Sequence, residues 1–225
     1  MSKAPKIVLS DKKAETAGLI LRCLIVFFVP FITGIIIFKK KEISPFGGND
    51  LLAIDLWSQY FPMYRKFALD HGFSEAMYNW SGALGFNNWL QNAFYTRSIF
   101  LIPFGLIPFE KSMTYIDIVC LLRFGLGAAA CQLFLEYKFK SKSPVIMAAS
   151  VGYGLCAYST AFIMQFMWTD GLFLGPLVLL GLERLINGKS PLMYVFMLAL
   201  TIYTNFYTGF GVCLFTGFYF IAEWA

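Results

Sequence analysis

Charged residues are scarce in this sequence, and so are the residue types on which most soluble enzymes rely. Asp, Glu, Lys and Arg make up 14% of the 225 residues, whereas soluble domains carry about 25%. His71 is the single histidine, and the five cysteines lie in apolar stretches without a C-x-x-C pair. No metal-binding cluster and no disulfide framework is therefore expected. P-loop, G-x-S-x-G and H-E-x-x-H motifs are also missing, so ATP-driven pumping and soluble-type hydrolysis gain no support.

Hydrophobic residues make up most of the sequence. They form 58% of the chain, and Phe alone occurs 25 times. This composition is typical of a polytopic protein embedded in a lipid bilayer. The net charge of +5 does not indicate nucleic-acid binding, because the basic residues form short clusters between apolar runs. In a membrane protein such clusters report topology.

Apolar runs of suitable length predict the membrane spans, since a crossing helix needs about 20 apolar residues. The predicted spans are 17–38, 113–135, 144–167, 171–186, 191–207 and 208–225. Residues 39–112 form a long first loop with amphipathic helices, in which the short run 98–109 is re-entrant or interfacial. We therefore expect an all-α polytopic membrane protein with one transmembrane domain, 1–225. Its apolar end predicts the N-terminal fragment of a longer protein.

The basic clusters predict the orientation of these spans. Three clusters fall on one side of the predicted bundle: Lys3, Lys6, Lys12 and Lys13; Lys138, Lys140 and Lys142; Arg184 and Lys189. The positive-inside rule places this side in the cytoplasm, with residues 17–38 as an uncleaved signal anchor. The cluster Lys39–Lys41 disagrees, because it falls on the other side. Loop 39–112 and the turns near 165–170 and 204–209 then lie outside the cell membrane.

The run "DLLAIDLWSQYFP" (50–62) holds the first candidate catalytic residues. If helical, it places Asp55 and Gln59 on one face at a spacing of four residues. A carboxylate there could accept a proton from a hydroxyl as general base, or hold a divalent cation at a phosphate. Asp50 could equally be the cap of a helix N-terminus, and Asp55 a solvated surface residue.

Further candidates lie in the second span and in the two outer turns. Arg123, midway through its span, needs a partner, which is either a protein carboxylate or a ligand phosphate. Trp168 and Asp170 could serve as interface anchor and helix cap. Asn205 and Tyr207 could bind a sugar or satisfy a helix end. The segment "MYNWSGALGFNN" (77–88) suits carbohydrate stacking, but also suits any ordered loop.

Taken together, ordered blocks resemble the YfhO-type bacterial membrane proteins of the GT-C class of glycosyltransferases. The most specific are D-x-x-x-Q-Y-x-P from Asp55, W-x-D-x-x-x-x-x-P-L from Trp168, and N-F-Y-x-G from Asn205. The resemblance covers about residues 19–218. Thr169 stands where Leu is usual, and Thr96-Arg97-Ser98 replaces a more usual Ser-Pro.

The resemblance implies a sugar donor on polyprenyl phosphate and an extracellular polymer acceptor such as teichoic acid. Asp55 would be the catalytic carboxylate in the first outer loop, and Asp50 is the second candidate catalytic residue. The implied substrate-binding residues are Gln59, Tyr60, Arg65, Asn79, Trp80, Tyr95, Arg97, Arg123, Trp168, Asp170, Asn205 and Tyr207. A transporter or flippase that uses Arg123 and Asp170 as an intramembrane pair is the alternative, and a non-catalytic membrane scaffold is the third possibility.

Overall fold

The computed structural model describes residues 5–69, 77–80 and 84–224, and these are mostly helical. In chain order the elements are α1 (Pro5–Lys40), η1 (Leu56–Tyr60), α2 (Phe61–Leu69), β1 (Tyr78–Asn79), β2 (Phe86–Asn87), α4 (Asn88–Tyr95), η2 (Ile99–Leu106), α5 (Phe109–Phe139), α6 (Pro144–Gly154), α7 (Ala157–Ala161), α8 (Gly171–Ile186), α9 (Leu192–Thr204) and α10 (Phe206–Trp224). Lys3 and His71 lie outside the described residues.

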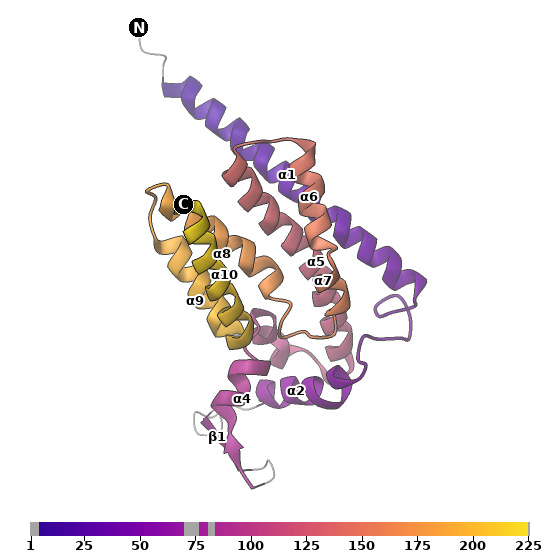
Figure 1. Cartoon of the computed structure of the whole chain (residues 1–225). Helices are drawn as coiled ribbons and strands as arrows, with labels where there is room; N and C mark the ends of the chain where they lie inside the picture. The colour runs from indigo at the N-terminus through magenta and orange to yellow at the C-terminus, as the bar shows by residue number, and fades with distance from the viewer. Residues whose placement is uncertain (1–4, 70–76, 81–83, 225) are drawn as a thin grey trace.

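Helix α5 is the centre of the bundle and packs against α1, α6 and α8 (Figure 1). Small residues allow this close approach, as the run "GLGAAA" predicts. A Cβ atom on Gly125 would lie 2.6 Å from the Phe27 ring, and one on Gly127 would lie 2.7 Å from Leu172. The first glycine therefore accommodates α1 and the second accommodates α8.

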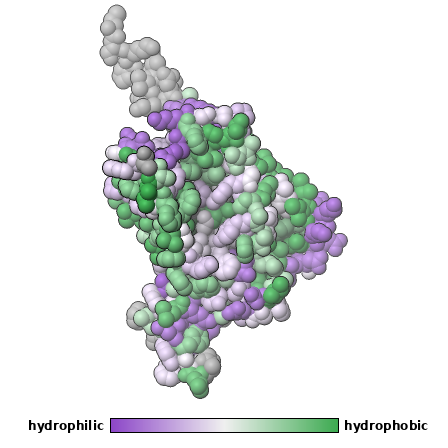
Figure 2. All heavy atoms as spheres, in the orientation of Figure 1, coloured by the Kyte–Doolittle hydropathy of each residue, from purple (hydrophilic) through white to green (hydrophobic). Residues whose placement is uncertain are grey.

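The bundle has the length and the surface of a membrane protein. Within the described residues, three helical segments are long and apolar enough to cross a bilayer: Lys13–Lys40, Phe109–Phe139 and Phe206–Trp224. Figure 2 shows hydrophobic residues over the middle of the molecule and hydrophilic residues towards its ends. The prediction of an all-α polytopic membrane protein is confirmed.

The continuous helix expected over 144–167 is wrong. Helix α6 ends at Gly154, the single turn α7 follows, and turns occupy the chain up to Asp170. The Ser159 hydroxyl lies 2.8 Å from the carbonyl oxygens of both Gly154 and Cys156 and can donate its single proton to either. The Ser159 side chain can thus satisfy the Gly154 carbonyl, which a continuous helix would have bonded, whereas the Cys156 carbonyl already accepts from the Thr160 N–H. Helix α8, by contrast, has the bounds predicted for it.

The apolar run 98–109 does not form a spanning helix. Its eight-residue 3₁₀ helix, η2, extends about 16 Å, roughly half of the hydrocarbon core of a bilayer. Leu101 and Phe104 face the protein and are buried, whereas Ile102 and Leu106 are exposed. This one-sided burial fits the short re-entrant or interfacial segment that we expected.

The segments that connect the helices lie at the two ends of the bundle. Residues 41–69, 77–80 and 84–108, which we call the loop layer, lie at one end beside the 162–170 turn and the α9–α10 junction (Figure 1). The α5–α6 and α8–α9 connections, with two of the basic clusters, lie at the opposite end. The three regions in which the sequence concentrates polar and aromatic residues therefore meet in space.

Candidate functional site

Asp55 lies at a distorted point of the loop layer. Ile54 before it has φ of 51°, which is unusual for a β-branched residue because its Cβ crowds the backbone. The next residues form the π-helical turn η1, in which the Phe61 N–H donates to the Leu56 carbonyl. This wider turn brings the hydroxyl of Tyr60, five residues on, to donate to Asp55 Oδ2 at 3.3 Å. The expected pairing of Asp55 with Gln59 at a four-residue spacing is thus replaced by a five-residue one.

Gln59, Tyr60 and Tyr95 complete what we call the Asp55 cluster. The Tyr60 and Tyr95 rings stack with centroids 5.5 Å apart, and Gln59 Nε2 donates to the Tyr95 hydroxyl at 3.2 Å. Burial, and then the neighbouring Asp55 carboxylate, raise the pKa of Tyr60. The Tyr60 hydroxyl therefore stays protonated and donates to a carboxylate that is itself exposed to solvent.

The interpretation of Asp50 as a helix cap is not correct, because no helix begins there. Asp50 Oδ1 accepts from the Leu52 N–H at 2.9 Å within a tight turn. Beside it lies Asp117 of α5, a fully buried residue that the sequence analysis missed. Its Oδ1 accepts from the Leu51 N–H at 3.2 Å, and Oδ2 has no hydrogen-bond partner among the described residues. Asp117 fastens the segment that leads to Asp55 onto α5.

Three aromatic rings, which we call the aromatic junction, connect the Asp55 cluster with the bundle. The centre of the Phe94 ring lies 4.6 Å from the ring centre of Tyr95, which belongs to the cluster. It lies 6.5 Å from the ring centre of Trp168 and 6.3 Å from that of Tyr207. Trp168 and Tyr207 lie 5.8 Å apart. Asn205 holds the junction together, since its Nδ2 donates to the Phe94 carbonyl at 2.6 Å and its Oδ1 accepts from the Thr208 N–H at 2.8 Å. The Asn205 side chain thus satisfies a helix end and also ties the start of α10 to α4.

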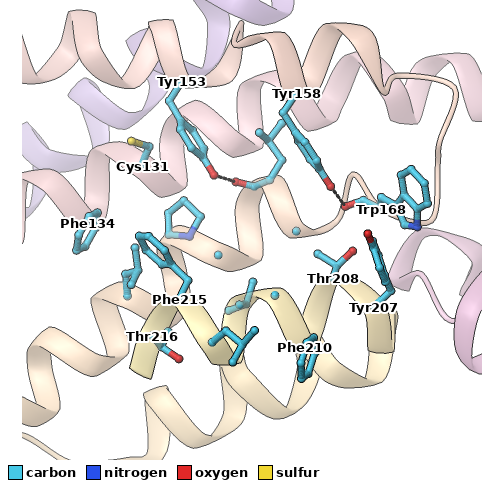
Figure 3. A pocket seen from close by; sticks show the side chains of 18 of the residues that line it. Cys131, Phe134, Tyr153, Tyr158, Trp168, Tyr207, Thr208, Phe210, Phe215 and Thr216 are labelled. Atoms are coloured by element: carbon cyan, nitrogen blue, oxygen red, sulfur yellow. Dashed lines mark hydrogen bonds between the residues drawn. The ribbon is translucent and has the colours of Figure 1, made fainter. Parts of the chain in front are cut away.

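A long apolar cavity of about 950 Å³ begins at the aromatic junction and runs along the bundle. Its walls come from α5, α6, α7, α8 and α10, as Figure 3 shows. Trp168, Tyr207 and Thr208 lie at one end, and Cys131, Phe134 and Thr216 at the other (Figure 3). Tyr153 and Tyr158 also line the cavity, but their hydroxyls donate hydrogen bonds to the carbonyls of Leu172 and Trp168, respectively. The lining is therefore suited to a long apolar chain. We call this cavity the groove.

Arg123 is buried in the bundle, where protein groups engage both of its Nη atoms, while its Nε has no hydrogen-bond partner among the described residues. Its Nη2 lies 2.5 Å from Asp170 Oδ1 and 3.0 Å from Ser98 Oγ. Its Nη1 donates to the Phe166 carbonyl at 2.8 Å and to Thr169 Oγ1 at 2.6 Å. The adjoining cavity measures only about 10 Å³, which is too small for a phosphate group. Asp170 does not cap α8 with its side chain, because that side chain faces Arg123 instead.

The other two candidate arginines differ in their surroundings. Arg65 Nη1 donates to the Ile107 carbonyl and to Ser112 Oγ, so Arg65 joins α2 to the start of α5. Arg97 lies 3.8 Å from the centre of the Trp89 ring and 5.1 Å from that of Tyr203. No carboxylate within the described residues lies at ion-pair distance from Arg97. Its side chain packs on these two aromatic rings.

The last two predicted residues, Asn79 and Trp80, point in different directions. Asn79 is buried in β1 and lines a second cavity, whereas Trp80 is 80% exposed and packs on Tyr78. Gly85, with φ of 91°, shapes the β1–β2 hairpin, since a Cβ there would lie 2.5 Å from the Tyr78 hydroxyl. No group of three His, Cys, Asp or Glu residues placed to hold a metal occurs in the described part of the chain.

The fold and surface define an α-helical membrane protein with several helices. Residues 26–225 match the family model described as bacterial membrane protein YfhO, and the chain belongs to this family. Comparison with curated proteins and with solved structures yields no match.

Proposed function

We propose that this chain is the transmembrane part of a GT-C-type glycosyltransferase. It would transfer a sugar from a polyprenyl-phosphate donor to a polymer acceptor, such as teichoic acid, on the outer side of the bacterial cell membrane. Its N-terminus would lie in the cytoplasm. The observation that carries the proposal is a continuous line of contacts from the exposed Asp55 carboxylate, through the aromatic junction, to the groove.

Asp55 is the proposed general base. It would accept the proton of an acceptor hydroxyl, whose oxygen forms a bond to the anomeric carbon of the donor sugar. The bond from that carbon to the phosphate oxygen breaks, and its electron pair leaves with the lipid phosphate. A phosphate leaving group needs little protonation, so positioning of the hydroxyl and neutralisation of the phosphate supply the catalysis. The Tyr60 hydroxyl supports this role by orienting the carboxylate.

The groove would hold the isoprenoid chain of the donor. Its walls are apolar, and it lies among helices that the bilayer surrounds. The end at Trp168 and Tyr207 would place the phosphate and the sugar beside the loop layer, where aromatic rings can stack on a sugar face. Arg97 is the proposed partner of the donor phosphate, because Arg65 and Arg123 are held by protein groups.

The transporter alternative gains less from the geometry. It requires the Arg123–Asp170 pair to open along a path, yet four hydrogen bonds hold Arg123 and the adjoining space is very small. The scaffold alternative leaves the strained backbone at Ile54, directly before the exposed Asp55, without a use. Strained residues of this kind cluster at functional sites.

The direct test replaces Asp55 by Asn in the full-length protein, expressed at wild-type level in cells. Lipid-linked sugar should accumulate and the wall polymer should lose its sugar, because a general base contributes roughly 100- to 10,000-fold to the rate. Glu110→Gln is the matched control, since Glu110 is an exposed carboxylate in the first turn of α5. Unchanged sugar pools with Asp55→Asn would exclude Asp55 from the chemistry.

A further inference from the structure

A second cavity, of about 260 Å³, lies within the loop layer between α2, α4 and the β1–β2 hairpin. Amide side chains dominate its polar lining: Asn79, Asn88, Gln91 and Asn92. Asn79, Asn88 and Asn92 are each at most 7% exposed. We call it the amide pocket. Its volume lies just below the range of about 300–1,000 Å³ for small-molecule sites, so it fits a single small unit.

The chemistry of this lining selects for hydroxyl groups. A side-chain amide carries two N–H donors and an acceptor oxygen, and a hydroxyl carries one donor and an acceptor oxygen. Each group can therefore both donate to and accept from the other. Asn92 Oδ1 accepts from Thr96 Oγ1 at 2.9 Å, which fixes the orientation of the amide. Phe67 and Phe86 supply apolar walls, suited to the C–H face of a sugar or polyol. The described lining residues include Lys66 and no carboxylate.

The amide pocket lies next to the Asp55 cluster along one seam between α2 and α4. Gln59, in the η1 turn that leads into α2, donates to the Tyr95 hydroxyl across this seam. Gln91 Nε2 lies 3.5 Å from Met63 Sδ, and each of these residues is one helical turn away from the first pair. One helical turn rises about 5.4 Å. The groove reaches the same cluster through Phe94, by way of Trp168 and Tyr207. The cluster thus lies between the groove and the amide pocket.

We propose that the amide pocket binds a polyhydroxylated unit of the acceptor polymer and so presents the neighbouring hydroxyl to Asp55. This inference deepens the proposed function and rests on it. The donor sugar would enter from the groove and the acceptor from the amide pocket, so that the two substrates meet at the carboxylate without crossing each other's path.

Binding to the full-length protein in lipid nanodiscs tests the inference without requiring turnover. The probes are a short poly(glycerol phosphate) oligomer and a neutral glucan oligosaccharide, titrated by calorimetry. At least one should bind the wild type, and Gln91→Leu and Asn92→Leu should each weaken it about tenfold, the effect of roughly one lost hydrogen bond. Gln91 is only partly buried, so its variant remains informative if Asn92→Leu does not fold. Asn187→Leu, at the opposite end of the bundle, is the control and should bind like the wild type.

The outcomes separate this inference from the proposed function. Asp55→Asn should retain acceptor binding while losing transfer. If neither probe binds the wild type, or if both amide variants bind normally, the pocket does not hold the acceptor. Weakened binding of a polyprenyl-phosphate sugar, with acceptor binding intact, would assign the pocket to the donor and overturn the inference. Normal transfer by Asp55→Asn together with amide-dependent binding would refute the catalytic proposal alone.

Discussion

Replacing Asp170 by Asn should strongly destabilise the protein, because it leaves the Arg123 charge buried without a counter-charge. The side chains of Arg123 and Asp170 are 2% and 1% exposed, and Arg123 Nη2 lies 2.5 Å from Asp170 Oδ1. Breaking a buried pair by neutralising one partner costs about 3–5 kcal/mol. Asn retains a carbonyl oxygen that can accept from Arg123, so we expect the lower end, about 3 kcal/mol. For a chain of this length that loss lowers the melting temperature by roughly 6–12 °C.

Thermal unfolding in detergent micelles, followed by tryptophan fluorescence, measures this effect. The double variant Arg123→Met/Asp170→Leu is the informative companion, because it removes both charges and leaves apolar groups. If the pair is a structural link, the double variant should be markedly more stable than the sum of the two single changes predicts. A melting temperature of Asp170→Asn within about 2 °C of the wild type, which corresponds to roughly 0.5–1 kcal/mol, would refute the reasoning.

Two other predictions follow from named contacts. Gly127→Ala should lower the melting temperature because its Cβ would lie 2.7 Å from Leu172, whereas Gly152→Ala has open space and should gain about 0.5–1 kcal/mol; equal melting temperatures would contradict the close α5–α8 packing. Tyr60→Phe removes the donor to Asp55 while keeping the ring stack, and its raised pKa means that this donor is present throughout the neutral range. Sugar transfer by Tyr60→Phe should fall about tenfold with folding unchanged, and wild-type transfer rates would exclude an orienting role.

The helices could be predicted wherever apolar length alone decides them. The bounds of α8 follow from its hydrophobic run between Asp170 and Asn187, and α1 and α5 contain the expected spans. The break after Gly154 could not be predicted, because it involves the Ser159 hydroxyl, which can donate to the Gly154 carbonyl in place of a helical N–H. A hydropathy profile counts that serine only as a weakly polar residue inside an apolar run.

The candidate site was predictable in its location and less so in its contacts. Alternation of the spans is enough to bring Asp55, Trp168 and Asn205 to one end of the bundle. The partner of Arg123 depends on the three-dimensional packing of two helices and remained open between Asp170 and a ligand. Asp117 carried a signal that should have been used, since an ionisable residue within an apolar span needs a partner. Its partner is a backbone N–H in a distant loop, which no spacing rule identifies.

The anchors of the loop layer have a consequence for the setting in which the protein works. Asp117 and the Arg65 contact to Ser112 fix this layer to α5, while Asn205 fixes it to the α9–α10 junction. Helices respond to a thinner or thicker bilayer by changing their tilt. A change in the tilt of α5 relative to α10 would therefore be transmitted through these anchors and would alter the alignment of Asp55 with the groove. The relative placement of Asp55 and the groove would thus depend on the thickness of the surrounding bilayer.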